Sequence, residues 1–288
     1  MEQQNNKFDS GEENWKAGIN QFSDMTDEER AQSLGKRPLR NNNQRIEEPR
    51  KNFLKEATVV KAAIFSLPYP NWTFRYGPIQ DQGICGSCWA FTATGMLESY
   101  ANELSGTSNL IERLSARNLV NCDSNNYGCD GGWVDDAFIY VRANGIATES
   151  EYPYYDGTPA SGQKTDCAVT APRLQAPINL TACNRITTGT AACSETDLIA
   201  RIKIRPVGVY LFVNGAFQSY STGIITLGCN VSNHAANLVG YGKSGTKEYW
   251  LVRNQWGTSW GEQGYARISR KSRCGGLPFD GFFQINSP

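Results

Sequence analysis

The cysteines constrain this chain more than any other feature of its sequence. There are nine, all between Cys85 and Cys274. An oxidising compartment pairs eight of nine cysteines in disulfides, so one thiol is expected to have another role. Sequons for N-glycosylation at Asn71, Asn179 and Asn230 favour such a compartment. The alternative is a cytosolic protein whose cysteines are all reduced core residues.

Composition excludes several classes of protein. The 288 residues include 28 basic and 28 acidic side chains, and this balance argues against a nucleic-acid or anionic-membrane partner. The apolar stretches are too short to cross a bilayer, so no transmembrane segment is expected, and the N-terminus has no signal-peptide pattern. One or two globular domains remain, with protein or small-molecule partners.

The chain divides into two parts by composition. Residues 1–65 lack cysteine and are rich in Asn, Gln, Glu, Lys and Arg, which indicates a separate segment, whereas residues 66–288 form the predicted compact domain. Patterns typical of helices come first in this domain and patterns typical of strands follow. The helices are predicted at 88–104, 114–122 and 133–144, and the strands at 207–213, 235–241, 249–254 and 264–269. This order predicts an α+β fold of two lobes with a cleft between them.

One histidine, His234, has to serve any mechanism that needs an imidazole. Cys88 begins a predicted helix, and a helix N-terminus and a nearby imidazolium both stabilise a thiolate. Asn254 can orient the imidazole, and Trp256 can shield their hydrogen bond from water. The Gln82 side chain can join the Cys88 backbone N–H in an oxyanion hole. One His and one thiol are too few ligands for zinc, so no metal is expected. The structural alternative is that these are ordinary core, turn and loop residues.

The sequence around these residues resembles the papain family of cysteine peptidases, and best its cathepsin L-like endopeptidases. Residues 82–91 read QGICGSCWAF. Further blocks follow in the family's order: LVNC at 119–122, GCDGG at 128–132, EYPY at 151–154, HA at 234–235 with VGYG at 239–242, and NQWG at 254–257 with SWG at 259–261. The resemblance implies a papain-like fold, with a helical left lobe and a β-barrel-like right lobe. It assigns Cys88, His234, Asn254 and Gln82 the roles given above. Asn254 follows Cys88 somewhat later than in the family pattern, and Gln255 stands where many relatives have Ser.

The family's disulfide pattern implies three pairs, and the cysteines that remain besides Cys88 give a fourth. The pairs are Cys85–Cys129, Cys122–Cys167, Cys229–Cys274 and Cys183–Cys193.

The resemblance also implies a substrate-binding set. Gly131 and Gly132 would bind the substrate backbone, and Trp133 and Tyr210 would line the pocket for the second residue before the scissile bond. Asn233 and Trp256 belong to the same set. The floor is either Phe279, which gives a closed apolar pocket, or Asp280, which would select Arg. Tyr210 leaves little room for a long side chain, which favours the apolar pocket and a preference for Leu or Val.

A short motif marks the first part of the chain. Gly18, Asn20, Phe22 and Asp24 recur with period two, and by spacing alone this predicts a short strand within Lys16–Asp27. The same residues resemble the motif of cathepsin L-like propeptides, whose tail blocks the active-site cleft. The resemblance implies that residues 1–65 are an inhibitory propeptide, cut between residues 36 and 55 on activation. It also implies an upstream signal peptide, which this sequence lacks, and a long upstream helix, of which only the end, around Asn5 and Asn6, would be present.

We therefore expect a cysteine endopeptidase that acts through a thioester at Cys88, uses no cofactor, and is synthesised as an inhibited precursor. Expected partners are protein or peptide substrates and cystatin-like inhibitors. A monomer is expected, located in the lysosome or secreted. The alternatives are a binding protein that uses the same cleft, a structural protein with reduced thiols, and an exopeptidase of the same family. The intact Cys, His, Asn and Gln set argues against the first.

Overall fold

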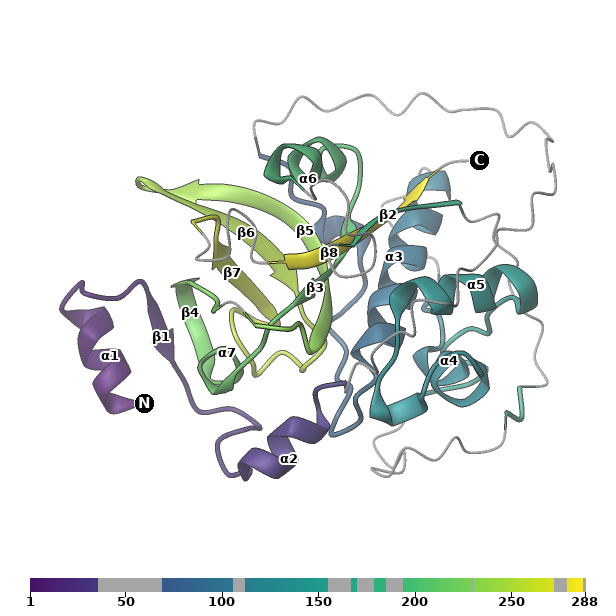
Figure 1. The fold of residues 1–288 in the computed structure, drawn as a ribbon, viewed down its shortest axis with the longest axis horizontal. Helices are drawn as coiled ribbons and strands as arrows, with labels where there is room; N and C mark the ends of the chain where they lie inside the picture. Colours follow the sequence, from purple (N-terminus) through teal and green to yellow (C-terminus); the bar gives the residue numbers. More distant parts are fainter. Residues whose placement is uncertain are drawn as a thin grey trace.

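The computed structural model describes residues 1–35, 69–105, 112–154, 167–169, 179–184, 194–228, 230–271 and 279–286. The helices between residues 88 and 144 lie on one side of the molecule and most of the strands on the other (Figure 1). We call residues 82–154 the helical lobe, residues 194–286 the β lobe and residues 1–35 the N-terminal segment. The N-terminal segment runs along the sheet and reaches the boundary between the two lobes (Figure 1).

The helical lobe is built around α3 (Cys88–Ser105), which is buried along most of its length. Its side chains are apolar or small on nearly every side, which suits a helix in a core. Beside it lie α4 (Ala116–Cys122) and α5 (Val134–Asn144), with the 3-10 helix η2 (Gly128–Asp130) between them in the chain. Ser115 caps α4, and Gly145, with a φ of 73°, ends α5. The three helices predicted from the sequence are confirmed within a few residues.

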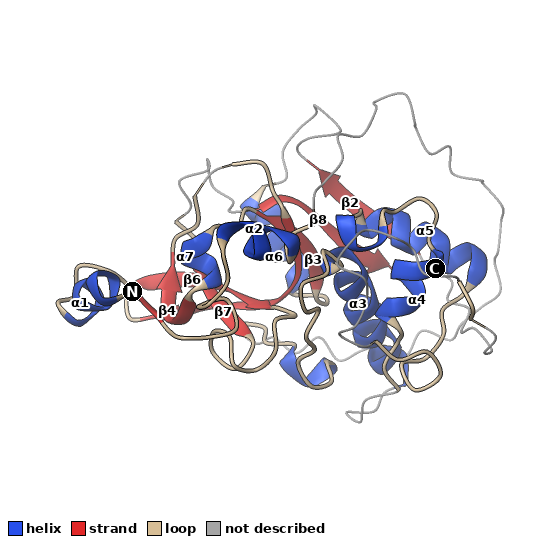
Figure 2. Ribbon diagram, turned by 90° about the horizontal axis from the view of Figure 1, so that it is seen from below, coloured by secondary structure: helices blue, strands red, loops and turns tan. Residues whose placement is uncertain are grey.

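A mixed sheet, most of whose strands belong to the β lobe, has the strand order β1-β4-β7-β6-β5-β3-β8-β2. The strands are β1 (Trp15–Ala17), β2 (Asn179–Asn184), β3 (Val207–Leu211), β4 (Tyr220–Ile225), β5 (His234–Ser244), β6 (Lys247–Arg253), β7 (Tyr265–Ser269) and β8 (Phe279–Asn286). Among the described strands only β4 and β7 pair in parallel. The sheet curves (Figure 2) and is open, with β1 and β2 at its edges. The four predicted strands correspond to β3, β5, β6 and β7.

Several short elements were not predicted. They are α1 (Glu2–Asp9), α2 (Asp27–Gln32), the 3-10 helix η1 (Thr73–Arg75), α6 (Glu195–Ile202) and α7 (Gly215–Gln218). The start of α2 has a sequence signal, because Thr26 and Glu29 form a capping box. None of the helices in the described ranges is long and apolar enough to span a membrane.

The strand predicted within Lys16–Asp27 is wrong beyond Ala17, where β1 ends. The chain then turns, because the Asn20 side chain accepts a hydrogen bond from the Phe22 backbone N–H at 3.0 Å and Ser23 Oγ accepts one from Asn20 N–H at 3.0 Å. Such local side-chain bonds compete with strand pairing. The period-two spacing therefore reflects contacts with the β lobe rather than an extended strand.

Candidate active site

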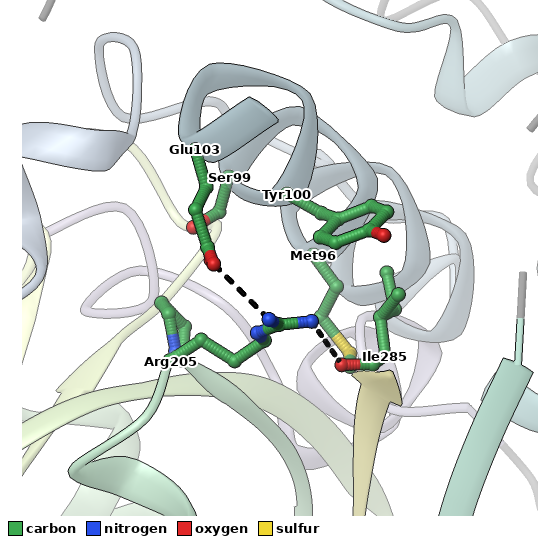
Figure 3. Close-up of a pocket in the computed structure, with 7 residues that line it drawn as sticks. Met96, Ser99, Tyr100, Glu103, Arg205 and Ile285 are labelled. Carbon is green, nitrogen blue, oxygen red and sulfur yellow. Dashed lines mark hydrogen bonds and ion pairs between the residues drawn. The ribbon is translucent and has the colours of Figure 1, made fainter. Parts of the chain in front are cut away.

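The packing between the lobes sets the direction of α3 relative to the sheet. Just before β3, Arg205 bonds Glu103 at the far end of α3, with Nη2 3.0 Å from Oε1, and donates to the Ile285 carbonyl at 2.8 Å (Figure 3). At the other end of β3, Leu211 lies opposite His234 on β5. The first residue of α3, Cys88, therefore points toward the His234 end of β5.

A close contact between α3 and β5 fixes how far along these two elements Cys88 and His234 lie. Gly95 on α3 lies so near β5 that an added Cβ would be 2.7 Å from Asn237 Nδ2. From this contact Cys88 is seven helical residues away and His234 three strand residues away, about 10 Å along each element. Cys88 and His234 thus lie at the same end of the interface between the lobes.

The turn before α3 is held to the loop that contains Cys129. Cys85 and Cys129 form a disulfide, and the Gly86 N–H donates to the Cys129 carbonyl at 2.9 Å. A Cβ on Gly86 would lie 2.5 Å from that carbonyl oxygen, so the approach requires glycine. Cys88 itself is 4% exposed and carries a thiol outside the disulfides. The helix dipole of α3 favours its thiolate.

His234 is held by the segment that follows β6. Its Nε2 lies 2.8 Å from Asn254 Oδ1, and the Trp256 ring lies 4.7 Å from the imidazole centroid. All three side chains are buried. Burial lowers the pKa of His234 to about 4, and the Asn254 hydrogen bond offsets part of this effect. A protonated ring in this site therefore needs a negative partner, which the Cys88 thiolate can supply.

Gln82 lies beside the start of α3. Its Nε2 donates to the Cys85 carbonyl at 2.7 Å and to the Ser33 carbonyl at 2.8 Å. Its backbone N–H donates to the Gln255 carbonyl at 3.0 Å. The donor that the sequence assigns to an oxyanion hole is thus bonded to a carbonyl of the N-terminal segment.

The N-terminal segment covers the nucleophile at Gly35. A Cβ at this position would lie 3.1 Å from both Gly131 Cα and the Gly86 carbonyl, and 3.6 Å from Cys88 Sγ. Ser33 is fully buried. We call residues 33–35 the strap. The strap therefore lies over Gly131, Gly86 and Cys88.

Further back, the N-terminal segment docks on the β lobe. Strand β1 pairs with β4, Asn20 Nδ2 donates to the Gln218 carbonyl at 2.9 Å, and Gln21 Nε2 donates to the Trp256 carbonyl at 2.5 Å. Phe22 is 4% exposed and packs edge-on against Trp256, with ring centroids 4.8 Å apart. The Trp256 ring that packs on His234 therefore also packs on Phe22 of the segment.

Two of the predicted pocket residues lie together. The Trp133 and Tyr210 rings meet edge to face with centroids 5.8 Å apart, and the Tyr210 hydroxyl accepts a hydrogen bond from Val134 N–H at 2.7 Å. Phe283 packs against Tyr210 on another side, at 4.9 Å. Tyr210 is only 1% exposed, so its ring fills the space between Trp133 and Phe283.

A family model for papain family cysteine proteases matches residues 71–277. The chain belongs to this family. It is 36% identical over 291 residues to digestive cysteine proteinase 2 of Homarus americanus, covering 96% of this chain and 81% of that protein. It is 33% identical over 283 residues to a cathepsin L-like proteinase of Phaedon cochleariae, covering 94% and 79%.

Solved structures agree with this assignment. The digestive procathepsin L 3 of Tenebrio molitor larval midgut superposes with a TM-score of 0.75 at 29% identity, covering 100% of this chain and 88% of that one. The papain-like α+β fold predicted from the sequence is confirmed. As a member of the papain family with procathepsin L as a structural neighbour, the protein is a cysteine endopeptidase that is synthesised as a proenzyme.

Other residues of the predicted substrate-binding set are placed differently from Trp133 and Tyr210. Asn233 Oδ1 accepts from the Val213 N–H at 2.8 Å, and Asn233 Nδ2 donates to the Val213 carbonyl at 2.9 Å. Asn233 thus stabilises the turn before His234. Gly131 has a φ of 120°, and a Cβ on Gly132 would lie 2.3 Å from Asn126 Oδ1. Both glycines are thus required by the backbone on which the strap lies.

The structure does not bring Phe279 to the Trp133–Tyr210 pair. Strand alternation alone would put Phe279 on the same face as Phe283, but the register shifts between Tyr210 and Leu211. Phe279 lies opposite Leu211 and packs in the β core, 6.2 Å from Trp250. Phe283 lies against Tyr210 instead. Asp280 is the residue added at the shift, and its side chain is outside the described residues.

Two of the four expected disulfides are formed, Cys85–Cys129 and Cys122–Cys167. The other two pairs involve Cys193, Cys229 and Cys274, which lie outside the described residues, and Cys183, whose side chain does too. Of the three sequons, Asn71 and Asn230 are exposed, and the Asn179 side chain is outside the described residues.

Sequence reasoning missed three residues that contact the site. Ser33 and Gly35 have no motif of their own, so nothing in the sequence placed them on Gln82 and Cys88. Tyr154 donates its hydroxyl proton to the Gln82 carbonyl at 2.8 Å. Its signal was present, because it ends the EYPY block, but that block carried no assigned role.

Proposed function

We propose that four side chains perform the peptide-bond hydrolysis of this endopeptidase: Cys88, His234, Asn254 and Gln82. The observation that carries the proposal is the 2.8 Å bond between His234 Nε2 and Asn254 Oδ1, at the end of β5 that faces the start of α3. Because Asn254 accepts from Nε2–H, Nδ1 is the ring nitrogen that exchanges a proton with Cys88. Within the described residues Nδ1 has no other hydrogen-bond partner.

The first half of the reaction forms a thioester. The Cys88 thiolate attacks the carbonyl carbon, and the carbonyl oxygen becomes an oxyanion held by Gln82 Nε2–H and the Cys88 backbone N–H. When the C–N bond breaks, the His234 imidazolium gives its proton to the leaving amine nitrogen. The acyl group stays on sulfur and the ring is neutral.

The second half regenerates the enzyme. Neutral His234 takes a proton from water, the resulting hydroxide attacks the thioester carbonyl, and the C–S bond breaks. The products are a carboxylic acid and the Cys88 thiolate, which pairs again with the imidazolium. No redox partner enters the balance.

Substitution of the pair tests this assignment. The processed enzymes carrying Cys88→Ala or His234→Ala are each expected to lose peptide hydrolysis by about 10³-fold or more, because the two residues act as a unit. Val231→Ala is the matched control, since Val231 is near His234 in the chain but 65% exposed. Its kcat/KM is expected to equal that of the wild type. Full activity in either active-site variant would reject the mechanism.

We further propose that residues 1–65 inhibit in cis through the strap. Its support is that the Ser33 carbonyl takes the hydrogen bond from Gln82 that an oxyanion needs, while Gly35 lies over Cys88. Cleavage between residues 36 and 55, which lie outside the described residues, would free the strap. The domain boundary proposed between residues 65 and 66 also lies outside the described residues. Equal hydrolysis by the uncut chain and by the processed enzyme would contradict this role.

The pocket beside Trp133 is proposed to accept Leu or Val in preference to Arg or Phe. Its support is the ring of Tyr210, which is fixed by the Val134 N–H and by Phe283 and so shortens the space. Each lost methylene contact costs about 1 kcal/mol, so we expect a graded preference of about 10-fold. If Asp280 formed the floor instead, Arg would be preferred.

The test of the pocket compares kcat/KM for peptides that differ only at the second residue before the scissile bond. Tyr210→Leu is expected to raise kcat/KM for the Phe peptide relative to kcat/KM for the Leu peptide. Tyr127→Ala, which alters a tyrosine that is 51% exposed, is the control and should leave the ratio unchanged. An Arg peptide equal to or better than the Leu peptide in the wild type would place Asp280 at the floor.

We propose that the enzyme acts on protein or peptide substrates as a monomer in a lysosome or after secretion, and that cystatin-like proteins inhibit it. The proposed location is supported by the disulfides Cys85–Cys129 and Cys122–Cys167, which persist in oxidising compartments, and by relatives named as digestive proteinases. A fractionation that found the processed enzyme only in the cytosol would oppose this location.

A further inference from the structure

Gln255 lies between the histidine and the proposed oxyanion donor. Its side chain is 2% exposed, and Nε2 donates to the Ala235 carbonyl at 2.8 Å while lying 3.4 Å from His234 Nε2. Its backbone carbonyl accepts the hydrogen bond from Gln82 N–H at 3.0 Å. The sequence has Gln here, where many relatives have Ser. A serine hydroxyl is too short to make both side-chain contacts.

The neighbouring backbone fixes which end of this amide faces the imidazole. With the amide reversed, Gln255 Oε1 and the Ala235 carbonyl would be two acceptors 2.8 Å apart. The N–H end therefore faces His234 Nε2. That nitrogen also contacts Asn254 Oδ1 at 2.8 Å.

This geometry treats the two protonation states of the ring differently. In the imidazolium, Nε2–H donates to Asn254, and the positive end of the Gln255 amide dipole then faces a positive ring. In the neutral ring Nε2–H remains but the net positive charge is gone, so this repulsion is weaker. A dipole placed in this way favours the neutral form, and burial strengthens the effect because the surroundings screen it poorly.

Within the described residues, few charged or titratable groups lie near His234. Cys88 begins α3 at the same end of the interface between the lobes. Arg253, next to Asn254, directs its guanidinium to the Gly77 and Pro78 carbonyls, at 3.2 and 2.9 Å. Asp81, whose backbone pairs with Trp256, accepts from Gly83 N–H at 3.0 Å. The part of the strap over the site, Ser33 to Gly35, brings no charge.

We propose that Gln255 is a positioning residue that joins the His234–Ala235 backbone to the Gln82 loop and disfavours the imidazolium form of His234. This rests on the proposed role of His234. Because the active enzyme needs the thiolate–imidazolium pair, loss of the ring proton ends activity at high pH. Gln255 therefore sets the alkaline limb of the pH profile at a lower pH than a residue without this dipole would.

The test is the pH dependence of kcat/KM for the processed enzyme. Gln255→Met keeps the volume and removes the amide, and Gln255→Glu places a carboxylate beside the ring. We expect the alkaline limb to move up by about half a pH unit in the first and by more in the second. Gln284→Met is the matched control. That buried amide donates to the Arg201 and Arg205 carbonyls at 2.8 and 3.1 Å, away from the site, so its loss should leave the limb in place.

An alkaline limb that stays in place or moves down in both Gln255 variants overturns the inference, even if activity falls equally at every pH. If Gln255→Met does not fold, Gln255→Glu decides alone. Failure of the proposed mechanism would look different, because His234→Ala would then retain hydrolysis whatever the Gln255 variants do.

Discussion

The N-terminal segment contacts the two lobes in different ways. On the β lobe it adds strand β1 to the sheet, buries Phe22 against Trp256 and makes side-chain bonds such as Asn20 to Gln218. On the helical lobe it contributes the strap, which touches Gln82, Gly86, Gly131 and Cys88. We therefore propose that the β lobe supplies most of the affinity for the segment and that the strap on the helical lobe blocks the site.

The largest expected effect comes from breaking the contact with the β lobe. Phe22→Ala removes a buried ring and should weaken docking by about 3 kcal/mol, or roughly 100-fold. The initial rate of peptide hydrolysis by the uncut chain, followed on a gel to exclude processing, should rise accordingly. Ile19→Ala is the control, because Ile19 is 83% exposed in the same segment. An unchanged initial rate in Phe22→Ala would mean that the β lobe does not hold the segment.

A buried carboxyl makes the helical lobe respond to pH. Glu98 on α3 accepts from Leu114 N–H at 2.8 Å, and burial raises its pKa from 4.5 to about 7. Since the folded pKa lies above the unfolded value, the native state binds more protons between these pH values. The contribution of Glu98 to stability is therefore greatest below about pH 4.5 and is lost as pH rises to about 7, by about 3 kcal/mol.

Glu98→Gln should remove most of that pH dependence while keeping an oxygen for the Leu114 N–H. The measurement is Tm at pH 5 and pH 8 in a Cys88→Ala background, which prevents self-digestion. The control is Glu103→Gln, which alters a carboxyl of the same helix that pairs with Arg205 at 3.0 Å and should keep the slope. If Glu98→Gln retained the full slope, the pH response would have another source.

A smaller effect is expected at the strap. Gly35→Ala places a Cβ 3.1 Å from Gly131 Cα and the Gly86 carbonyl, so the strap has to shift by a few tenths of an ångström. We expect the uncut chain to gain about 10-fold in initial rate while the segment stays docked, since β1 and Phe22 are untouched. Gly215→Ala meets no atom within 4 Å and is the matched control. If Gly35→Ala raised the initial rate as much as Phe22→Ala, docking on the β lobe and blocking by the strap would not be separate contributions.

The residues of the site differ in how well local sequence patterns predict their positions. Cys88, His234, Asn254 and Gln82 were chosen because each chemical role requires one side-chain type in one block, and the fold brings these blocks together. The helices were predictable from local patterns, and α3 begins at Cys88. Phe279 was harder, because its face depends on a one-residue shift against β3 that no local period reveals. The turn at Asn20 was missed because a side-chain bond outweighs the period-two pattern.

The contacts of the strap were not predictable for a related reason. Ser33 and Gly35 meet Gln82, Gly86 and Gly131 only after the segment has docked some distance away on the β lobe. Such contacts depend on the whole path of the chain. Residues 33–35 carry no sequence motif, so only the fold shows that they contact the site.

We propose that the two lobes together activate one thiol. The deciding measurement is the rate of alkylation of Cys88 by iodoacetamide against pH, in the processed wild type and in His234→Ala. We expect fast alkylation that persists well below pH 8.5 in the wild type, and a profile like that of an ordinary thiol in His234→Ala. Identical profiles in the two proteins would show that His234 does not activate Cys88.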